Sequence, residues 1–293
     1  MHTTFITGGA GQLGSCLQEL MPADTRIIAP NSAAFDLSQP HTLEKLLGTY
    51  RPNQIINCGA YTNVDRAETQ TDLARRINAD AVRVLAVYAA KHSIPLVHVS
   101  TDFVFDGRKR TPYAPNDETN PLNAYGATKL AGELAAIEAN PKTWVVRASG
   151  IYSHHGNNFV LKIIELAQQR KSLSVVTDQV GSPCYAPNLA KALWEILSVQ
   201  PPVGIYHFAD LGEVSRCEFA QAIVDEAAAA GIIKKTIPIE GVLSSHFPSP
   251  ATRPEYSVLD SSLLKESAGV SVREWRPALQ DMIRHMAART HSN

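Results

Sequence analysis

The sequence lacks a strong charge of either sign, a cysteine motif and a long apolar run. Its formal net charge is −1 over 293 residues, which gives no electrostatic basis for binding nucleic acid or an anionic membrane surface. The four cysteines are far apart and form no Cys-x-x-Cys pair. This spacing argues against a zinc site or a disulfide framework and suits a reducing cytosol. Because the net charge is close to zero, any anionic ligand must be held by a local site.

The first residues also lack the features of a targeting signal. Residues 3–7 read as a strand, with no basic segment and no long apolar stretch beside them. We therefore expect no signal peptide, no membrane-spanning helix and a cytoplasmic protein.

Short β-branched runs alternate with helical patterns through the first half of the chain. The expected strands are residues 3–7, 26–29, 54–57, 96–100 and 144–147, and the expected helices are residues 11–20, 39–49, 72–92 and 121–138. Strands separated by helical crossovers predict a parallel sheet covered on both faces. The expected fold class is α/β, a Rossmann-like doubly wound parallel sheet with a smaller C-terminal α/β substrate lobe.

The second half is less regular. Its expected helices are residues 158–170, 187–199, 217–230 and 276–288, and its expected short strands are residues 172–176 and 204–208. We expect an NAD(P)-binding domain over residues 1–150 and a substrate-binding lobe over residues 151–293. Some segments of the lobe are expected to return to the first domain.

A glycine motif follows the first strand directly and opens the first helix. Gly8, Gly11 and Gly14 have the spacing Gly-x-x-Gly-x-x-Gly, which suits a tight turn, close approach of a pyrophosphate and packing of the helix against the sheet. The amides of Gln12 and Leu13 would point at phosphate from the helix N-terminus. A glycine motif alone is weak evidence, but this position between strand and helix predicts a dinucleotide site.

The end of the second strand has neither an acid nor an arginine. An acid there would hold the ribose hydroxyls of NAD, whereas this chain has Ala-Pro-Asn-Ser at residues 29–32. The next acid, Asp36, and its neighbour Leu37 are better placed to meet adenine. NADPH is therefore the favoured cofactor, with NADH as the other candidate.

Small residues end the third strand. Cys58, Gly59, Ala60 and Tyr61 stand at the carboxyl edge of the expected sheet, where small side chains let a cofactor lie across the strand ends. The alternative is a plain tight strand exit.

The pattern with the most chemical content is Thr101 followed by Tyr125-x-x-x-Lys129. It offers a hydroxyl, a phenol and an ammonium that could meet at one carbonyl oxygen. A lysine four residues after a tyrosine lies on the same helical face, and its charge would favour the tyrosinate. Lowering a tyrosine pKa by about 3 units takes roughly 4 kcal/mol, which a lysine and a cationic nicotinamide nearby could supply together. Alternatively, Thr101 is a turn or cap residue and the helical pair is a chance one.

These motifs carry a family resemblance. GGAGQLG, NCGAYTNVDRAE, STDFVFDG, NAYGATKLAGE, GNNFV, DQVGSPCYAPNLA and RPEYSVLD appear in the order seen in extended short-chain dehydrogenases. The set is most similar to the dTDP-4-dehydrorhamnose reductases and spans nearly the whole chain. The resemblance implies a Rossmann domain with a sugar-nucleotide lobe, and hydride transfer from NAD(P)H to a C4 ketone that yields dTDP-L-rhamnose.

The resemblance also implies roles for individual residues. Tyr125 would donate the proton, Lys129 would hold the nicotinamide ribose and lower the tyrosine pKa, and Thr101 would hydrogen-bond the carbonyl oxygen. The implied substrate-binding residues are Val64, Thr101, Asp102, Phe103, Asn158 and Arg253. Two of these have structural alternatives: Asn158 as a helix cap, and Arg253 as an ion-pair partner of Glu255 or Asp260.

The chain departs from the family pattern at two places. Gly150 stands where relatives often have a tryptophan that packs against the sugar, so the pocket is wider or another group, such as Tyr152, fills it. Some relatives have a glutamate after the glycine motif that binds magnesium at a dimer contact, whereas this chain has Ser15 and Cys16. We therefore expect no metal and interpret the His154-His155 pair as part of a loop.

Three functions remain candidates. The leading one is reduction of a nucleotide-activated 4-keto-6-deoxysugar, with a homodimer as one candidate assembly. The second is reduction of another nucleotide-bound ketosugar. The third is a non-catalytic NADP-binding regulatory subunit resembling the methionine adenosyltransferase beta subunit. The complete set of Thr101, Tyr125 and Lys129 favours an enzyme.

Overall fold

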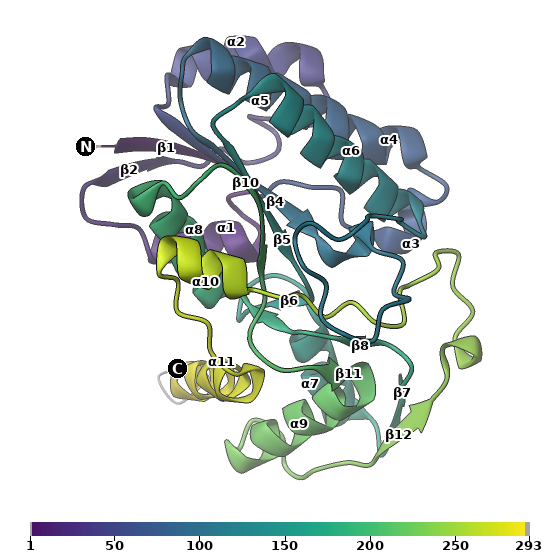
Figure 1. Cartoon of the computed structure of the whole chain (residues 1–293). Coiled ribbons are helices and arrows are strands. Elements are labelled where there is room, and N and C mark those ends of the chain that lie inside the picture. The colour runs from purple at the N-terminus through teal and green to yellow at the C-terminus, as the bar shows by residue number, and fades with distance from the viewer. Residues whose placement is uncertain (1, 291–293) are drawn as a thin grey trace.

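The computed structural model describes residues 2–290. Its centre is a parallel sheet of six strands in the order β10-β5-β4-β3-β1-β2 (Figure 1). These strands are β1 (His2–Thr7), β2 (Thr25–Ile28), β3 (Gln54–Asn57), β4 (Leu96–Thr101), β5 (Thr143–Ala148) and β10 (Gly204–Phe208). The chain moves from β1 outward to β2 and then returns to the other side of β1 at β3. This reversal leaves a crevice beyond the carboxyl ends of β1 and β3, where ligands bind in open α/β sheets.

Alternate residues of each strand supply the two hydrophobic cores of the sheet. Phe5 and Ile55 face the core under α2 (Pro40–Tyr50) and α5 (Ala81–Lys91). Ile6 and Ile56 face the opposite core. The helices of that second face are α1 (Gln12–Glu19), α8 (Ala186–Val199) and α10 (Ser262–Ala268). Burial on both faces explains the continuous apolar strands, and the Rossmann-like fold class is confirmed.

The helix expected over residues 72–92 contains a change of helical type. It consists of α4 (Thr71–Arg75), the π-helical segment η1 (Arg76–Asp80) and α5, and is preceded by the short α3 (Val64–Ala67). Asn78, in the π segment, donates from Nδ2 to the Tyr61 carbonyl at 3.2 Å and to Thr128 Oγ1 at 3.1 Å. It also accepts from the Tyr61 amide at 2.8 Å. Asn78 thereby ties the segment after β3 to α6 (Ala124–Ala139).

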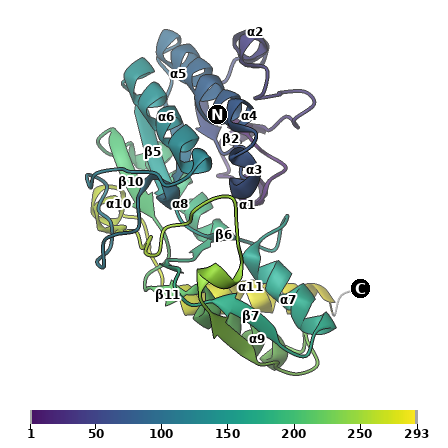
Figure 2. The same ribbon diagram turned by 90° about the vertical axis from the view of Figure 1, so that its right-hand side faces the viewer.

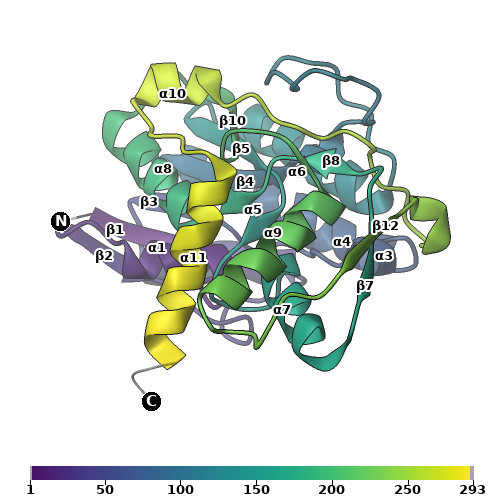
Figure 3. The ribbon, with the colours of Figure 1, turned by 90° about the horizontal axis from the view of Figure 1, so that it is seen from below.

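A second lobe lies beyond the carboxyl edge of the sheet, with α7, α9 and α11 around its own core (Figures 2 and 3). Its helices are α7 (Phe159–Gln169), α9 (Arg216–Ala229) and α11 (Trp275–Thr290). Its strands are β6 (Ile151–Tyr152), β7 (Leu173–Val176), β8 (Val180–Gly181), β9 (Cys184–Tyr185), β11 (Val214–Ser215) and β12 (Ile239–Val242). These strands form three two-stranded pairs, β11-β8, β12-β7 and β6-β9. Two single 3-10 turns, η2 (Asp102–Val104) and η3 (Ser244–His246), complete the elements.

The chain crosses between the two parts more than once. β10 pairs with β5 from Gly204 with Trp144 to Phe208 with Ala148, and α8 packs on the sheet beside α1. Both elements follow residue 150, so the sheet is completed by segments from the second half of the chain. The division into parts at residue 150 stays a prediction. Across residues 2–290, none of the helices combines the length and apolarity that a membrane crossing requires.

Candidate active site

A long cleft runs along the carboxyl edge of the sheet, with a volume of about 800 Å³. It begins at the glycine turn after β1 and reaches the end of β4 and the lobe. The predicted cofactor residues that line it are Gly8, Gly11, Gln12, Leu13, Gly14, Asp36, Leu37, Cys58, Gly59, Ala60 and Tyr125. Tyr61 has another environment, since its hydroxyl donates to Gln70 at 2.7 Å.

The glycine turn brings α1 close to the cleft. A Cβ on Gly14 would lie 2.3 Å from the carbonyl oxygen of Gly8, so a side chain there would push the helix away from the turn. Gly11 caps α1 without a side-chain hydrogen bond. The amides of the first helical turn have no intrahelical acceptor and can bind an anion in the cleft. The turn therefore fits a dinucleotide pyrophosphate.

The loop after β2 supplies small uncharged side chains to the cleft. Pro30, Asn31 and Ser32 line this part. Asp36 is turned onto its own loop, where it accepts from the amide and the hydroxyl of Ser38, both at 2.9 Å. The carboxylate of Asp36 is thus engaged by Ser38, although Asp36 lines the cleft.

Thr101 and Tyr125 meet at the other end of the cleft. Thr101 ends β4, and its hydroxyl is near enough to Tyr125 to act on the phenol, whose pKa it lowers. The same hydroxyl donates to Asp102 Oδ1 at 3.0 Å and accepts from the Phe103 amide at 3.2 Å. Thr101 is therefore both the cap of the turn that follows β4 and the neighbour of the phenol.

Burial sets the ionisation of Tyr125. The pKa of the phenol is raised to about 12, chiefly by burial and also by the charge of Asp102, although Thr101 acts in the lowering direction. The lowering expected from the charges of Lys129 and a nicotinamide stays a prediction, and burial of the phenol acts in the opposite direction. The reason is that desolvation of the phenolate outweighs the nearby polar groups.

Lys129 is buried one helical turn after Tyr125. Its Nζ donates to the Val99 carbonyl at 2.7 Å. Burial lowers the pKa of Lys129 to about 8, while the negative charge of Glu133 and the thiol of Cys58 act in the raising direction. The ammonium is thus held below the floor of the cleft by β4.

Asp102 is a buried carboxylate with several donors around it. Ser149 Oγ donates to Oδ2 at 2.9 Å and Thr101 to Oδ1. Burial raises the pKa of Asp102, whereas hydrogen bonds from Ser257, Ser149 and Thr101 and the charge of Arg216 lower it. The carboxylate thereby fixes the direction of the Thr101 hydroxyl.

A smaller hollow of about 130 Å³, the inner pocket, continues from the long cleft into the lobe. The residues that line both are Asp102, Phe103, Gly150, Ile151 and Arg216. Arg253 lines the inner pocket, but its guanidinium is paired with Asp65 at 3.0 and 3.1 Å. The pairing of Arg253 with Glu255 or Asp260 considered from the sequence is therefore replaced by a pairing with Asp65. Val64 lines the long cleft.

Gly150 leaves the border of the two hollows open. Its φ is +53°, and a Cβ there would meet only Pro183 Cα at 3.7 Å and Ser182 O at 3.8 Å. Tyr152, which the sequence offered as a filler, is fully buried and stacked on Tyr185, with ring centroids 5.5 Å apart. Tyr152 therefore does not fill this position, and the space beside Gly150 is open.

Asn158 has the structural role that the sequence left open. Its side chain accepts from the Leu161 amide at 3.1 Å and so caps α7. Its Nδ2 donates to Gln12 Oε1 at 2.9 Å and to the Ser153 carbonyl at 2.7 Å. Asn158 also lines the long cleft, where it joins the glycine turn to the lobe.

The His154-His155 loop contacts α1. His155 Nε2 lies 2.8 Å from Glu19 Oε1, and the ligand atoms of Cys16, Glu19 and His155 lie within 4.8 Å of one another. The sequence did not indicate this cluster because His155 is far from Cys16 and Glu19 in the chain. Its contacts suit a hydrogen-bonded pair between His155 and Glu19, and the expectation of no metal stays a prediction.

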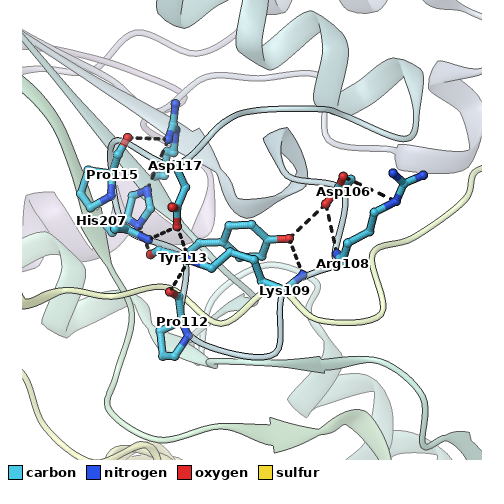
Figure 4. A network of polar contacts seen from close by, with 10 residues as sticks. Asp106, Arg108, Lys109, Pro112, Tyr113, Pro115, Asp117 and His207 are labelled. Atoms are coloured by element: carbon cyan, nitrogen blue, oxygen red, sulfur yellow. Dashed lines mark hydrogen bonds and ion pairs between the residues drawn. The ribbon is translucent and has the colours of Figure 1, made fainter.

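A network in residues 106–117 holds the connection from the Thr101 turn to the helix of Tyr125 (Figure 4). The Tyr113 hydroxyl donates to Asp106 at 3.2 Å, and Lys109 pairs with Asp117. The ring of His207, on β10, lies 2.9 Å from the Tyr113 carbonyl through Nδ1. Burial lowers the pKa of His207 to about 3, so the ring is neutral and Nδ1–H donates. This loop is thereby fixed to the sheet.

Comparison with known proteins agrees with this geometry. The family described as RmlD substrate binding domain matches residues 1–288. A dTDP-4-dehydrorhamnose reductase of Aggregatibacter actinomycetemcomitans is 35% identical over 96% of this chain and 98% of its own length. The chain belongs to the dTDP-4-dehydrorhamnose reductase family.

Solved structures of family members have the same fold. A dTDP-4-dehydrorhamnose reductase of Clostridium acetobutylicum has a TM-score of 0.91 and 35% identity, covering 97% of this chain and 99% of its own. One of Bacillus anthracis, in complex with NADP, has a TM-score of 0.91 and 33% identity with the same coverage.

Proposed function

We propose that the protein is an NADPH-dependent reductase of the C4 ketone of dTDP-4-dehydro-L-rhamnose, which it converts to dTDP-L-rhamnose. NADH is the second candidate cofactor. The observation that carries the proposal is the meeting of Thr101 and Tyr125 at the end of the long cleft, with Lys129 beneath them. Relatives that are 35% identical bear this enzyme name, and the Bacillus anthracis relative binds NADP.

Tyr125 acts as the proton donor in this proposal. Its pKa of about 12 keeps the phenol protonated at neutral pH, which is the form required when a ketone is reduced. A reduced nicotinamide held in the long cleft would supply the hydride for C4. The O–H bond of Tyr125 breaks as its proton moves to the developing alkoxide oxygen. Tyr125 is left as a phenolate, which the charge of Lys129 helps to stabilise.

Thr101 and Asp102 orient the proton donor. Because Thr101 donates to Asp102, the direction of its hydroxyl is fixed, and the phenol of Tyr125 lies in the long cleft that Thr101 also lines. In the bound complex Thr101 also contacts the substrate carbonyl. The remaining proposed substrate contacts come from Val64, Asp102, Phe103, Asn158 and Arg253.

The second candidate substrate is another nucleotide-bound ketosugar. The open backbone position at Gly150 favours it, because a wider pocket accepts a sugar of different shape. A non-catalytic regulatory subunit is disfavoured by the complete set of Thr101, Tyr125 and Lys129. A cytoplasmic location, a homodimer and the absence of nucleic-acid partners stay predictions.

The test is to mix the protein with dTDP-4-dehydro-L-rhamnose and NADPH and to follow the absorbance of the reduced cofactor. Oxidation that depends on the sugar nucleotide, with dTDP-L-rhamnose as product, supports the proposal. No oxidation with this substrate, but turnover of another nucleotide ketosugar, would favour the second candidate. No turnover with any ketosugar and intact NADPH binding would favour the regulatory subunit.

A further inference from the structure

Arg216 stands at the border between the long cleft and the inner pocket and lines both. It is the first residue of α9, and its amide donates to the Gln179 carbonyl at 3.0 Å. A capping box fixes the helix start, because Ser215 Oγ accepts from the Glu218 amide and Glu218 accepts from the Ser215 amide. The guanidinium lies 5.6 Å from the centre of the Phe159 ring. Both ends of the side chain are thus held in place.

The charge of Arg216 has no partner of its own. Arg147 is paired with Glu133 and Arg253 with Asp65. Among residues 2–290, no hydrogen bond or ion pair to the Arg216 side chain is formed. Asp102 is near enough to act on its charge, as is the like charge of Arg253. Arg216 is also the only cation among the described residues that line the long cleft.

The position of this unpaired arginine suits the diphosphate of a nucleotide sugar. The C4 ketone must reach Tyr125 in the long cleft, and the diphosphate on C1 lies across the sugar ring from C4. The diphosphate must therefore stand away from Tyr125, toward the lobe. Guanidinium groups bind phosphate oxygens through two parallel N–H donors. The 2′-phosphate of a dinucleotide would lie at the other end of the cleft, beside residues 30–32.

We propose that Arg216 binds the diphosphate of the nucleotide-sugar substrate and is the principal unpaired positive charge of that subsite. The assignment rests on the proposed function for the class of substrate. Arg253, held by Asp65, has a secondary role in this subsite. Arg216 also offsets the repulsion between the diphosphate and Asp102.

The experiment measures binding of nucleotides to the full chain by calorimetry, without turnover. The probes are dTDP, UDP and GDP, with thymidine as the matched ligand that lacks phosphate. The variants are Arg216→Met, Arg216→Lys, and Arg83→Met as a control from the exposed pair with Glu138. NADPH affinity checks that each variant is folded.

Arg216→Met should weaken binding of dTDP by about 10- to 100-fold, the loss expected for a charge-assisted hydrogen bond. Arg216→Lys should recover part of that loss, and Arg83→Met should match the wild type. Thymidine and NADPH affinities should not change. A dTDP affinity unchanged in Arg216→Met, an equal loss for thymidine, or wild-type protein that binds none of the three diphosphates would overturn the assignment. If dTDP binds in an Arg216-dependent way but the ketosugar is not reduced, the proposed reaction fails while this assignment stands.

Discussion

The Nζ atom of Lys129 donates a hydrogen bond to the backbone carbonyl of Val99 at 2.7 Å, two residues before Thr101 on β4. The lysine of the helical motif is thus fixed to the strand that carries the threonine. The contact joins the strand that ends at Thr101 to the helix that carries Tyr125 and Lys129.

The first prediction concerns pH. The pKa of Lys129 is lowered to about 8, so its positive charge is present below that pH and is lost above it. The value of kcat/KM for ketone reduction should therefore fall above about pH 8, since this parameter reports the groups of the free enzyme. In Lys129→Arg, whose residual activity is lower, the guanidinium stays charged and the alkaline decline should move to higher pH. The same decline in both proteins would assign it to another group.

The second prediction concerns the proton donor. Tyr125→Phe should reduce kcat by about 10²- to 10⁴-fold, the usual contribution of a general acid. NADPH affinity, measured by fluorescence titration, should stay nearly unchanged because the ring is kept. Tyr50→Phe, on α2 away from the cleft, is the matched control and should retain activity. Normal turnover of Tyr125→Phe would show that another group delivers the proton.

The third prediction concerns the buried ion pair beneath the site. Arg147 and Glu133 are both fully enclosed, with Arg147 Nε 3.0 and 3.1 Å from the two carboxylate oxygens. Glu133→Ala should lower the free energy of unfolding by about 3–5 kcal/mol, because it leaves a buried charge unpaired. Glu138→Ala, from an exposed pair, should change it by less than about 1 kcal/mol. Urea denaturation measures both, and equal small losses would contradict a structural role for the pair.

The fourth prediction concerns Gly150. Gly150→Ala has room for its methyl group, but φ is +53°, so the substitution should cost about 1 kcal/mol of stability through backbone strain. Gly48→Ala has nothing within 4 Å and lies inside α2. It should stabilise the protein by about 0.5–1 kcal/mol. Thermal unfolding compares the two, and similar effects at both positions would mean that strain at Gly150 is negligible.

Local signals in the sequence were sufficient for much of the fold and of the site. The glycine turn and the spacing from Tyr125 to Lys129 each lie within one turn or helix, so their geometry follows from short-range rules. The expected strands of the sheet also matched, because most of them contain a short run of buried apolar residues.

The features that the sequence did not reveal depend on distant contacts or on burial. The pair between Asp65 and Arg253 joins residues 188 positions apart, and no motif marks it. Arg216 lies within a capping box that the sequence shows, yet no local sequence pattern indicates that its side chain lines a pocket. The direction in which the Tyr125 pKa shifts depends on how fully the phenol is desolvated. The π segment around Asn78 has no composition signal, because its extra residue is accommodated by contacts with Tyr61 and Thr128.

The pairing of β10 with β5 limits how this protein can be divided. A fragment that stops at residue 150 would leave β5 as a bare sheet edge and uncover the face that α8 protects. Such edges recruit other strands and promote aggregation. A cofactor-binding module cut from this chain, or a chimera with a different sugar lobe, must therefore retain residues 186–208 as part of the dinucleotide half.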